Sequence, residues 1–246
     1  MFRAAEKNYM KKTIVCFLLA SGLLSAATID VYSTGYTTGG GFELVPTLAD
    51  GNWTLVSGPG GSVPSPYAPY VTFGSLLSQF PFSSGGWLKN NSFGSSSEWV
   101  GPDAIEQSNN PYSSTVPYVY QETFTLAGMN LSSVVIDGEW SADNYGYIVV
   151  NGAEVTTGID GIIPNSAGEF KSFTDFALNS SNADFLQTTN VIQFDVFNTA
   201  TGSPDVTGIN VDFESATADP APEPATFGIM GCALVALGVL RRTARR

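Results

Sequence analysis

The sequence contains no histidine, and its two cysteines, Cys16 and Cys232, lie in apolar runs near the two ends of the chain. Without histidine, neither a His-ligated zinc site nor a Ser–His or Cys–His catalytic pair can form. The long segment between the cysteines has no thiol, so no disulfide can link its parts. Its stability must come from a packed core, and its length is ample for one.

Basic residues are almost missing from the central part of the chain. Only Lys89 and Lys171 lie between residues 28 and 240, whereas 21 of the 22 acidic residues lie there, so the net charge of this stretch is −19. A region with two lysines cannot neutralise a phosphate backbone, which excludes nucleic acid as a partner. The charge is typical of a solvated acidic surface and is suited to recruiting cations.

Residues 1–27 have the three-part order of a secretory signal peptide. Two lysines precede the apolar run 13–24, and small residues follow that run. The run is too short for a stable membrane span. The order predicts a short signal helix, export, and cleavage after Ala26 or Ala27.

Residues 219–246 form a tail with three consecutive features. A proline-rich linker containing Pro222-Glu223-Pro224 favours an extended polyproline II conformation. The apolar stretch 226–240 then predicts a helix that is short of the roughly 20 residues of a spanning helix. A basic cluster that favours the cytoplasmic side ends the tail: Arg241, Arg242, Arg245 and Arg246.

The order of Pro222-Glu223-Pro224, apolar helix and terminal arginines, with a signal peptide at the other end, resembles the PEP-CTERM sorting signal. The resemblance implies recognition by an exosortase-type membrane protease and cleavage near the Pro-Glu-Pro motif. The precursor would be held in the inner membrane only transiently, and its product would be released or attached at the cell surface, outer envelope or extracellular matrix. A plain C-terminal anchor is the alternative.

Residues 28–218 predict a single all-β domain. Short runs of alternating apolar residues recur between turn signals, and no helical periodicity persists, which favours a β-sandwich or barrel. Asn151-Gly152 predicts a two-residue hairpin. In 190–198 the side that carries Ile192, Phe194 and Val196 is expected to face the core. The clearest predicted strands are 122–126, 133–142 with a bulge at Gly138, 146–150, 154–157, 190–198 and 208–214. The first half is less regular, with strands expected at 29–32, 53–56 and 70–73.

Part of this domain is similar to the galactose-binding-like domains found in many PEP-CTERM proteins. The resemblance rests on the run 118–126, on Trp140 followed by Asp143-Asn144, on the Asn-Gly hairpin, and on the later strand led by Asn190. It implies a single jelly-roll β-sandwich and, by analogy of fold alone, carbohydrate binding.

The residues Trp140, Asp143, Asn144 and Tyr145 are the candidate glycan-binding cluster. Aromatic rings stack on the C–H surfaces of sugars, and Asp and Asn side chains hydrogen-bond to hydroxyl groups. The alternative is that Trp140 fills the core while residues 143–146 form a turn, because Asp and Asn readily bond to their own backbone.

Asp137, Glu139 and Asp143 are a candidate calcium site, since carboxylates and backbone carbonyls are the ligands that calcium prefers. The alternative is a solvated acidic strand face, because Asp137 and Glu139 share one side of the strand. No other cofactor is expected.

We expect a non-catalytic protein, because the sequence has no nucleophile motif, phosphate-binding loop or metal-binding box. The sequence thus predicts an exported surface or matrix protein, processed at its tail, that binds or associates with extracellular polysaccharide. Two alternatives stay open. One is a structural matrix or envelope protein without specific glycan binding, and the other is a glycoside hydrolase that uses paired carboxylates.

Overall fold

The computed structural model describes residues 25–37, 44–72, 87–88, 96–104, 110–155, 162–164, 169–199 and 206–221, together with 228, 231 and 235. Nearly all of the signal segment 1–27 lies outside these ranges. The sorting residues Pro222, Glu223 and Pro224 and the four terminal arginines lie outside them as well.

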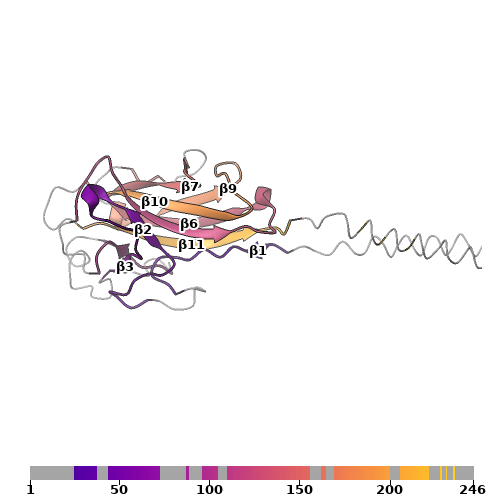
Figure 1. The fold of residues 1–246 in the computed structure, drawn as a ribbon, viewed down its shortest axis with the longest axis horizontal. Helices are drawn as coiled ribbons and strands as arrows, with labels where there is room; N and C mark the ends of the chain where they lie inside the picture. The colour runs from indigo at the N-terminus through magenta and orange to yellow at the C-terminus, as the bar shows by residue number, and fades with distance from the viewer. Residues whose placement is uncertain are drawn as a thin grey trace, which may run out of the picture.

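Two antiparallel β-sheets make up the domain (Figure 1), which confirms the all-β prediction. The six-stranded sheet has the order β3-β4-β11-β6-β9, with β1 also pairing with β11, and the five-stranded sheet has the order β2-β5-β10-β7-β8. The first sheet contains β1 (Ala27–Thr28), β3 (Tyr70–Val71), β4 (Val100–Gly101), β6 (Val135–Asp143), β9 (Thr174–Asn179) and β11 (Gly208–Ala218). The second contains β2 (Thr54–Ser57), β5 (Tyr118–Thr125), β7 (Tyr145–Val150), β8 (Ala153–Glu154) and β10 (Thr189–Phe197). The short 3-10 helices are η1 (Pro59–Gly61), η3 (Leu131–Ser133) and η4 (Glu169–Lys171).

From β4 onward the chain passes back and forth between the two sheets. Strands β4, β6, β9 and β11 lie in one sheet, and β5, β7, β8 and β10 lie in the other. Each sheet therefore pairs strands that are distant in sequence, as where β11 lies between β4 and β6. Neither sheet is formed by a continuous piece of the chain.

The core fills the space between the sheets, with aromatic rings near its centre. As predicted, Ile192, Phe194 and Val196 of β10 are buried in it. The Phe194 ring lies 5.0 Å from the Trp140 ring and 5.6 Å from the Trp53 ring, measured between centroids. Such tilted aromatic pairs add stability beyond the apolar area that they bury.

The bulge predicted at Gly138 lies instead on the neighbouring strand. The pairing of β6 with β11 shifts register between Phe213 and Ser215, so the extra residue belongs to β11. Gly138 has a different role, because a Cβ atom there would lie 2.3 Å from the carbonyl oxygen of Asp212 and 2.7 Å from the ring of Phe176. The glycine is required by close packing.

The predicted Asn151-Gly152 hairpin is confirmed. Both residues have positive φ, 51° and 83°, and they join β7 to β8. Two positive φ angles are the requirement of a type I′ turn, which Asn-Gly satisfies with little strain. The Asn151 side chain also accepts a hydrogen bond from the backbone N–H of Val191 at 2.9 Å, which ties the turn to β10.

The two ends of the described domain lie side by side (Figure 1). β1 pairs with the last two residues of β11, Thr217 and Ala218. Beyond them the chain docks on the turn before η3, where the Ala221 N–H donates to the Gly128 carbonyl at 2.8 Å. Among the described residues, no helix has both the length and the apolar character needed to cross a membrane.

Candidate functional site

The four predicted glycan-binding residues do not share one environment. Trp140 has an exposed fraction of 0 % and belongs to the core between the sheets. Its indole is packed against Phe194, and it also approaches Gly146, where an added Cβ would lie 3.0 Å from the indole. Neither face of Trp140 is open to a ligand, so its position matches the alternative of a core residue.

Asp143 lies on the outer side of the six-stranded sheet, where a small hydrophobic cluster covers it. Its exposed fraction is 4 %, and its Oδ2 accepts a hydrogen bond from the indole N–H of Trp87 at 2.9 Å. Trp87 in turn stacks on Trp99, with ring centroids 4.1 Å apart. Burial raises the pKa of Asp143 to about 7, and the hydrogen bond from Trp87 opposes this rise. Asp143 is thus enclosed and bound to a tryptophan.

Asn144 fastens the end of β6 to the end of β10. Its Oδ1 accepts a hydrogen bond from the Thr199 N–H at 2.7 Å, and its backbone N–H donates to the Phe197 carbonyl at 3.0 Å. Its Nδ2 donates to the Asp143 carboxylate. These bonds use both ends of the side-chain amide within the protein.

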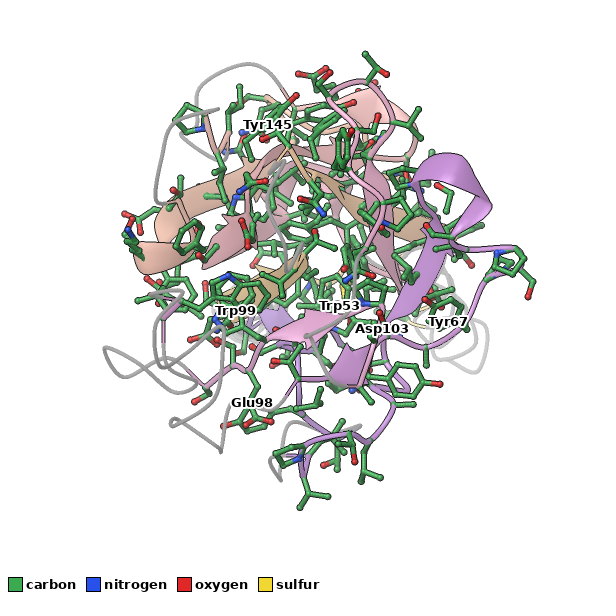
Figure 2. All side chains as sticks on the ribbon, turned by 90° about the vertical axis from the view of Figure 1, so that its left-hand side faces the viewer. Trp53, Tyr67, Glu98, Trp99, Asp103 and Tyr145 are labelled. Carbon is green, nitrogen blue, oxygen red and sulfur yellow. The ribbon has the colours of Figure 1, made fainter. Side chains whose placement is uncertain are left out.

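Tyr145 is the one member of the cluster whose ring lies at an open surface. It is half-buried on the outer side of the five-stranded sheet, and its hydroxyl donates to the Ser114 carbonyl at 3.2 Å. Its ring stacks on Phe197, with centroids 4.8 Å apart and an interplanar angle of 9°. Figure 2 shows Tyr145 on the opposite side of the domain from Glu98, with Trp99 between them.

Tyr145 is part of a larger surface formed by three adjacent strands. Residues of β7 and β10 that face outward pair directly, Tyr145 with Phe197 and Tyr147 with Asp195. In the next row Gln193 pairs with Gln121 of β5, and its amide donates to the Gln121 side-chain oxygen at 3.1 Å. We call this surface the aromatic face; it consists of Tyr145, Tyr147, Phe197, Asp195, Gln193 and Gln121.

The aromatic face is negatively charged at neutral pH. Burial raises the pKa of Asp195 to about 6; a hydrogen bond from Tyr147 lowers it, and the nearby Glu154 raises it. Burial and the same two carboxylates also raise the pKa of the Tyr147 phenol. The Asp195 Oδ1 is buried without a hydrogen-bond partner in the described part of the chain. The face thus combines aromatic rings, amides and one carboxylate.

The three candidate calcium ligands lie on one strand but are not brought together. Asp137 and Glu139 are half-buried on the outer side of the six-stranded sheet, and Asp137 accepts a hydrogen bond from the Ser215 hydroxyl at 3.1 Å. Asp143 is four residues beyond Glu139, about 13 Å along an extended strand. No group of three or more His, Cys, Asp or Glu side chains is arranged for a metal within the described ranges.

Most of the aromatic face was not singled out from the sequence. The alternation in 190–198 already placed Gln193, Asp195 and Phe197 on one side of their strand. The missing information was the register that sets this side beside Tyr145 and Tyr147. Two tyrosines spaced two residues apart on an outward strand face were the available local signal.

The aromatic face is the surface that the described geometry makes most suitable for a ligand. It has two half-buried tyrosine rings and the buried ring of Phe197, 7 % exposed, in register with hydrogen-bonding side chains, and it lies on the central strands of a sheet. No family model, curated protein or solved structure matches the chain.

Proposed function

We propose that this protein is a non-catalytic polysaccharide-binding protein of the cell surface or extracellular matrix, and that the aromatic face is its binding surface. The observation that carries the proposal is the register of Tyr145 and Tyr147 with Phe197 and Asp195 across β7 and β10. Rings that present partly exposed edges and faces can contact the C–H groups of sugars, while amides and a carboxylate hydrogen-bond to hydroxyls.

The charge of the protein narrows the class of polysaccharide. A net charge of −19 between residues 28 and 240 repels an anionic polymer, and Asp195 places one of these negative charges within the face itself. We therefore propose that the ligand is a neutral polysaccharide, or an anionic one only when cations bridge the two.

We further propose that the sandwich is a jelly roll. The strand order supports this, because eight successive strands divide into β4-β11-β6-β9 and β5-β10-β7-β8. A jelly roll has eight strands in two sheets that are connected as two Greek keys. On this proposal β1, β2 and β3 are additions at the sheet edges, and the fold alone implies no ligand.

The proposed location rests on the sequence of the two ends. An exosortase-type protease would cleave near Pro222-Glu223-Pro224 after export, and the tail would contact the membrane only until then. The described chain includes the residue just before this motif, Ala221, whose N–H donates to the Gly128 carbonyl at 2.8 Å.

Binding to a panel of neutral and anionic polysaccharides, with and without calcium, tests the proposed function. We expect the full-length chain to be retained by at least one neutral polymer, and to bind anionic polymers only with calcium present. If no polymer retains the chain under either condition, the alternative of a structural matrix protein is favoured. Release of soluble sugar from any polymer would instead indicate a glycoside hydrolase.

A further inference from the structure

A second group of polar side chains lies on the outer side of the six-stranded sheet, away from the aromatic face. Glu139 of β6 pairs with Asp212 of β11 on one side and with Asp175 of β9 on the other. Lys171 is the only basic residue among those described, and its ammonium lies 5.1 Å from the centre of the Phe170 ring. Within the described ranges, no basic side chain is shown to pair with this row of carboxylates.

Asp212 is the most enclosed of these carboxylates. Its exposed fraction is 7 %, its Oδ1 accepts a hydrogen bond from the Ser33 hydroxyl at 2.8 Å, and its Oδ2 accepts one from the Ser96 N–H at 2.9 Å. Each carboxylate oxygen has two lone pairs, so both retain capacity for a further ligand. Asp212 is thus held rigidly with acceptor capacity to spare.

Asn210 provides an independent sign of a missing ligand. It lies two residues before Asp212 on the same face, its exposed fraction is 0 %, and neither Oδ1 nor Nδ2 has a hydrogen-bond partner in the described part of the chain. The buried hydroxyl of Ser97, next to the residue that bonds to Asp212, is unpaired in the same way. A buried unsatisfied polar group is costly, and such groups in native proteins usually have a water or ion as partner.

The register places Glu139, Asp212 and Asn210 on one face of two neighbouring strands. Asn210 pairs with Ser141 and Asp212 pairs with Glu139, so Asn210 is a diagonal neighbour of Glu139 on the same face. Diagonal side chains in antiparallel sheets are about 7–8 Å apart at the backbone, and long side chains can converge across that gap. Glu139 is half-buried, which leaves a path from solvent.

We propose that a calcium ion binds on this face, between the carboxylates of Glu139 and Asp212 and the side-chain oxygen of Asn210, with Ser97 as a further oxygen ligand. All of these ligands are hard oxygen donors, which calcium prefers, and two negative charges balance its own. Of the three calcium ligands predicted from the sequence, this site retains only Glu139. Asp212 and Asn210 take the place of Asp137 and Asp143. Electrostatics agrees with the placement: burial and repulsion from Asp212, Glu214 and Asp175 raise the pKa of Glu139 to about 6.

Equilibrium dialysis of the full-length chain against radioactive calcium, after removal of metal with a chelator, tests this site. We expect one site with a Kd of roughly 0.1 to 1 mM, the range of extracellular calcium modules. Glu139→Gln should weaken binding at least about tenfold. The matched control is Asp137→Asn, which removes the same charge from the same strand face and should leave the Kd within about twofold.

A second variant separates ligation from charge. Asn210→Leu removes no charge, and it should abolish calcium binding while leaving the metal-free chain folded, because it also removes an unsatisfied buried amide. Thermal unfolding without calcium checks the folding of each variant. The proposal is overturned if the wild-type chain binds no calcium, if Asp137→Asn weakens binding as much as Glu139→Gln, or if Asn210→Leu binds calcium like the wild type.

Discussion

Tyr145 of β7 and Phe197 of β10 lie directly opposite each other, and their rings stack 4.8 Å apart at an interplanar angle of 9°. Aromatic pairs of this kind contribute about 0.5–1.5 kcal/mol beyond the area that they bury. Tyr147 extends the pair, since its ring centroid lies 5.8 Å from that of Phe197. The stack therefore both stabilises the sheet and fixes the position of the aromatic face.

Replacing Trp140 should affect stability and not ligand binding. Trp140 is fully buried against Phe194, so Trp140→Phe should lower the free energy of unfolding by roughly 1–3 kcal/mol through a partly filled cavity. The polysaccharide affinity of the folded variant should match the wild type. Urea unfolding and a binding assay on the same sample check both parts. A large loss of polysaccharide affinity without a loss of stability would indicate that Trp140 belongs to the binding site.

Gly146 should tolerate no side chain, because the neighbouring strand β10 and a tryptophan of the facing sheet both lie close to it. An added Cβ would lie 2.2 Å from the Asp195 carbonyl oxygen and 3.0 Å from Trp140, so Gly146→Ala should destabilise the domain by about 1–3 kcal/mol or more. Gly51→Ala is the control, because a Cβ at Gly51 has nothing within 4 Å. That variant should stay within about 0.5 kcal/mol of the wild type. Denaturant midpoints measure both, and equal effects would contradict this packing.

Stability should fall as the pH rises from acid to neutral. Burial raises the pKa of Asp50 to about 6 and that of Asp143 to about 7, and it raises the pKa of Glu122 well above its usual range. Each folded-state pKa exceeds the unfolded value, so the folded state binds protons more tightly. The stabilisation is complete below the unfolded pKa and is lost as pH rises through the folded one.

Thermal unfolding at constant ionic strength between pH 5 and pH 8 tests this expectation. Each titrating group contributes a slope of up to about 1.4 kcal/mol per pH unit within its window. Asp143→Asn should flatten the upper part of the curve, near pH 7, because the amide cannot ionise. A melting temperature that rises from pH 5 to pH 8 would contradict the burial of these carboxyl groups.

The tail should be needed for processing and not for folding. Pro222-Glu223-Pro224 follows Ala221, and none of the described contacts involves these three residues, so replacing them with alanines should leave those contacts intact. In a host with an exosortase-type protease, the variant should accumulate as an uncleaved, membrane-held form. Immunoblotting of membrane and extracellular fractions measures this. Normal cleavage of the variant would show that processing does not depend on this motif.

Local patterns predicted much of the fold. The alternation in 190–198 identified the buried side of β10, and Asn151-Gly152 identified a turn whose positive φ angles only a few residue types adopt readily. These signals work because side-chain direction in a strand depends on position alone. The all-β architecture followed from them.

Contacts between residues that are far apart in the chain could not be predicted from the sequence. Asp143 resembles a turn or binding residue until Trp87, far away in the chain, is seen to cover it. Gly138 suggests a bulge in its own strand until the close approach of the Asp212 carbonyl is known. The aromatic face depends on the register between β7 and β10, and a slip of one residue would reverse the side on which every side chain lies.

The aromatic face is tested most directly by measuring polysaccharide binding of two tyrosine variants. Tyr147→Ala removes a ring from the face, and Tyr112→Ala removes an exposed ring, 60 % accessible, that is not part of it. An aromatic anchor contributes about 2 kcal/mol, so Tyr147→Ala should weaken binding to the retained neutral polymer roughly 30-fold. Tyr112→Ala should bind like the wild type. Unchanged binding by Tyr147→Ala, with its fold intact by thermal unfolding, would contradict the proposed site.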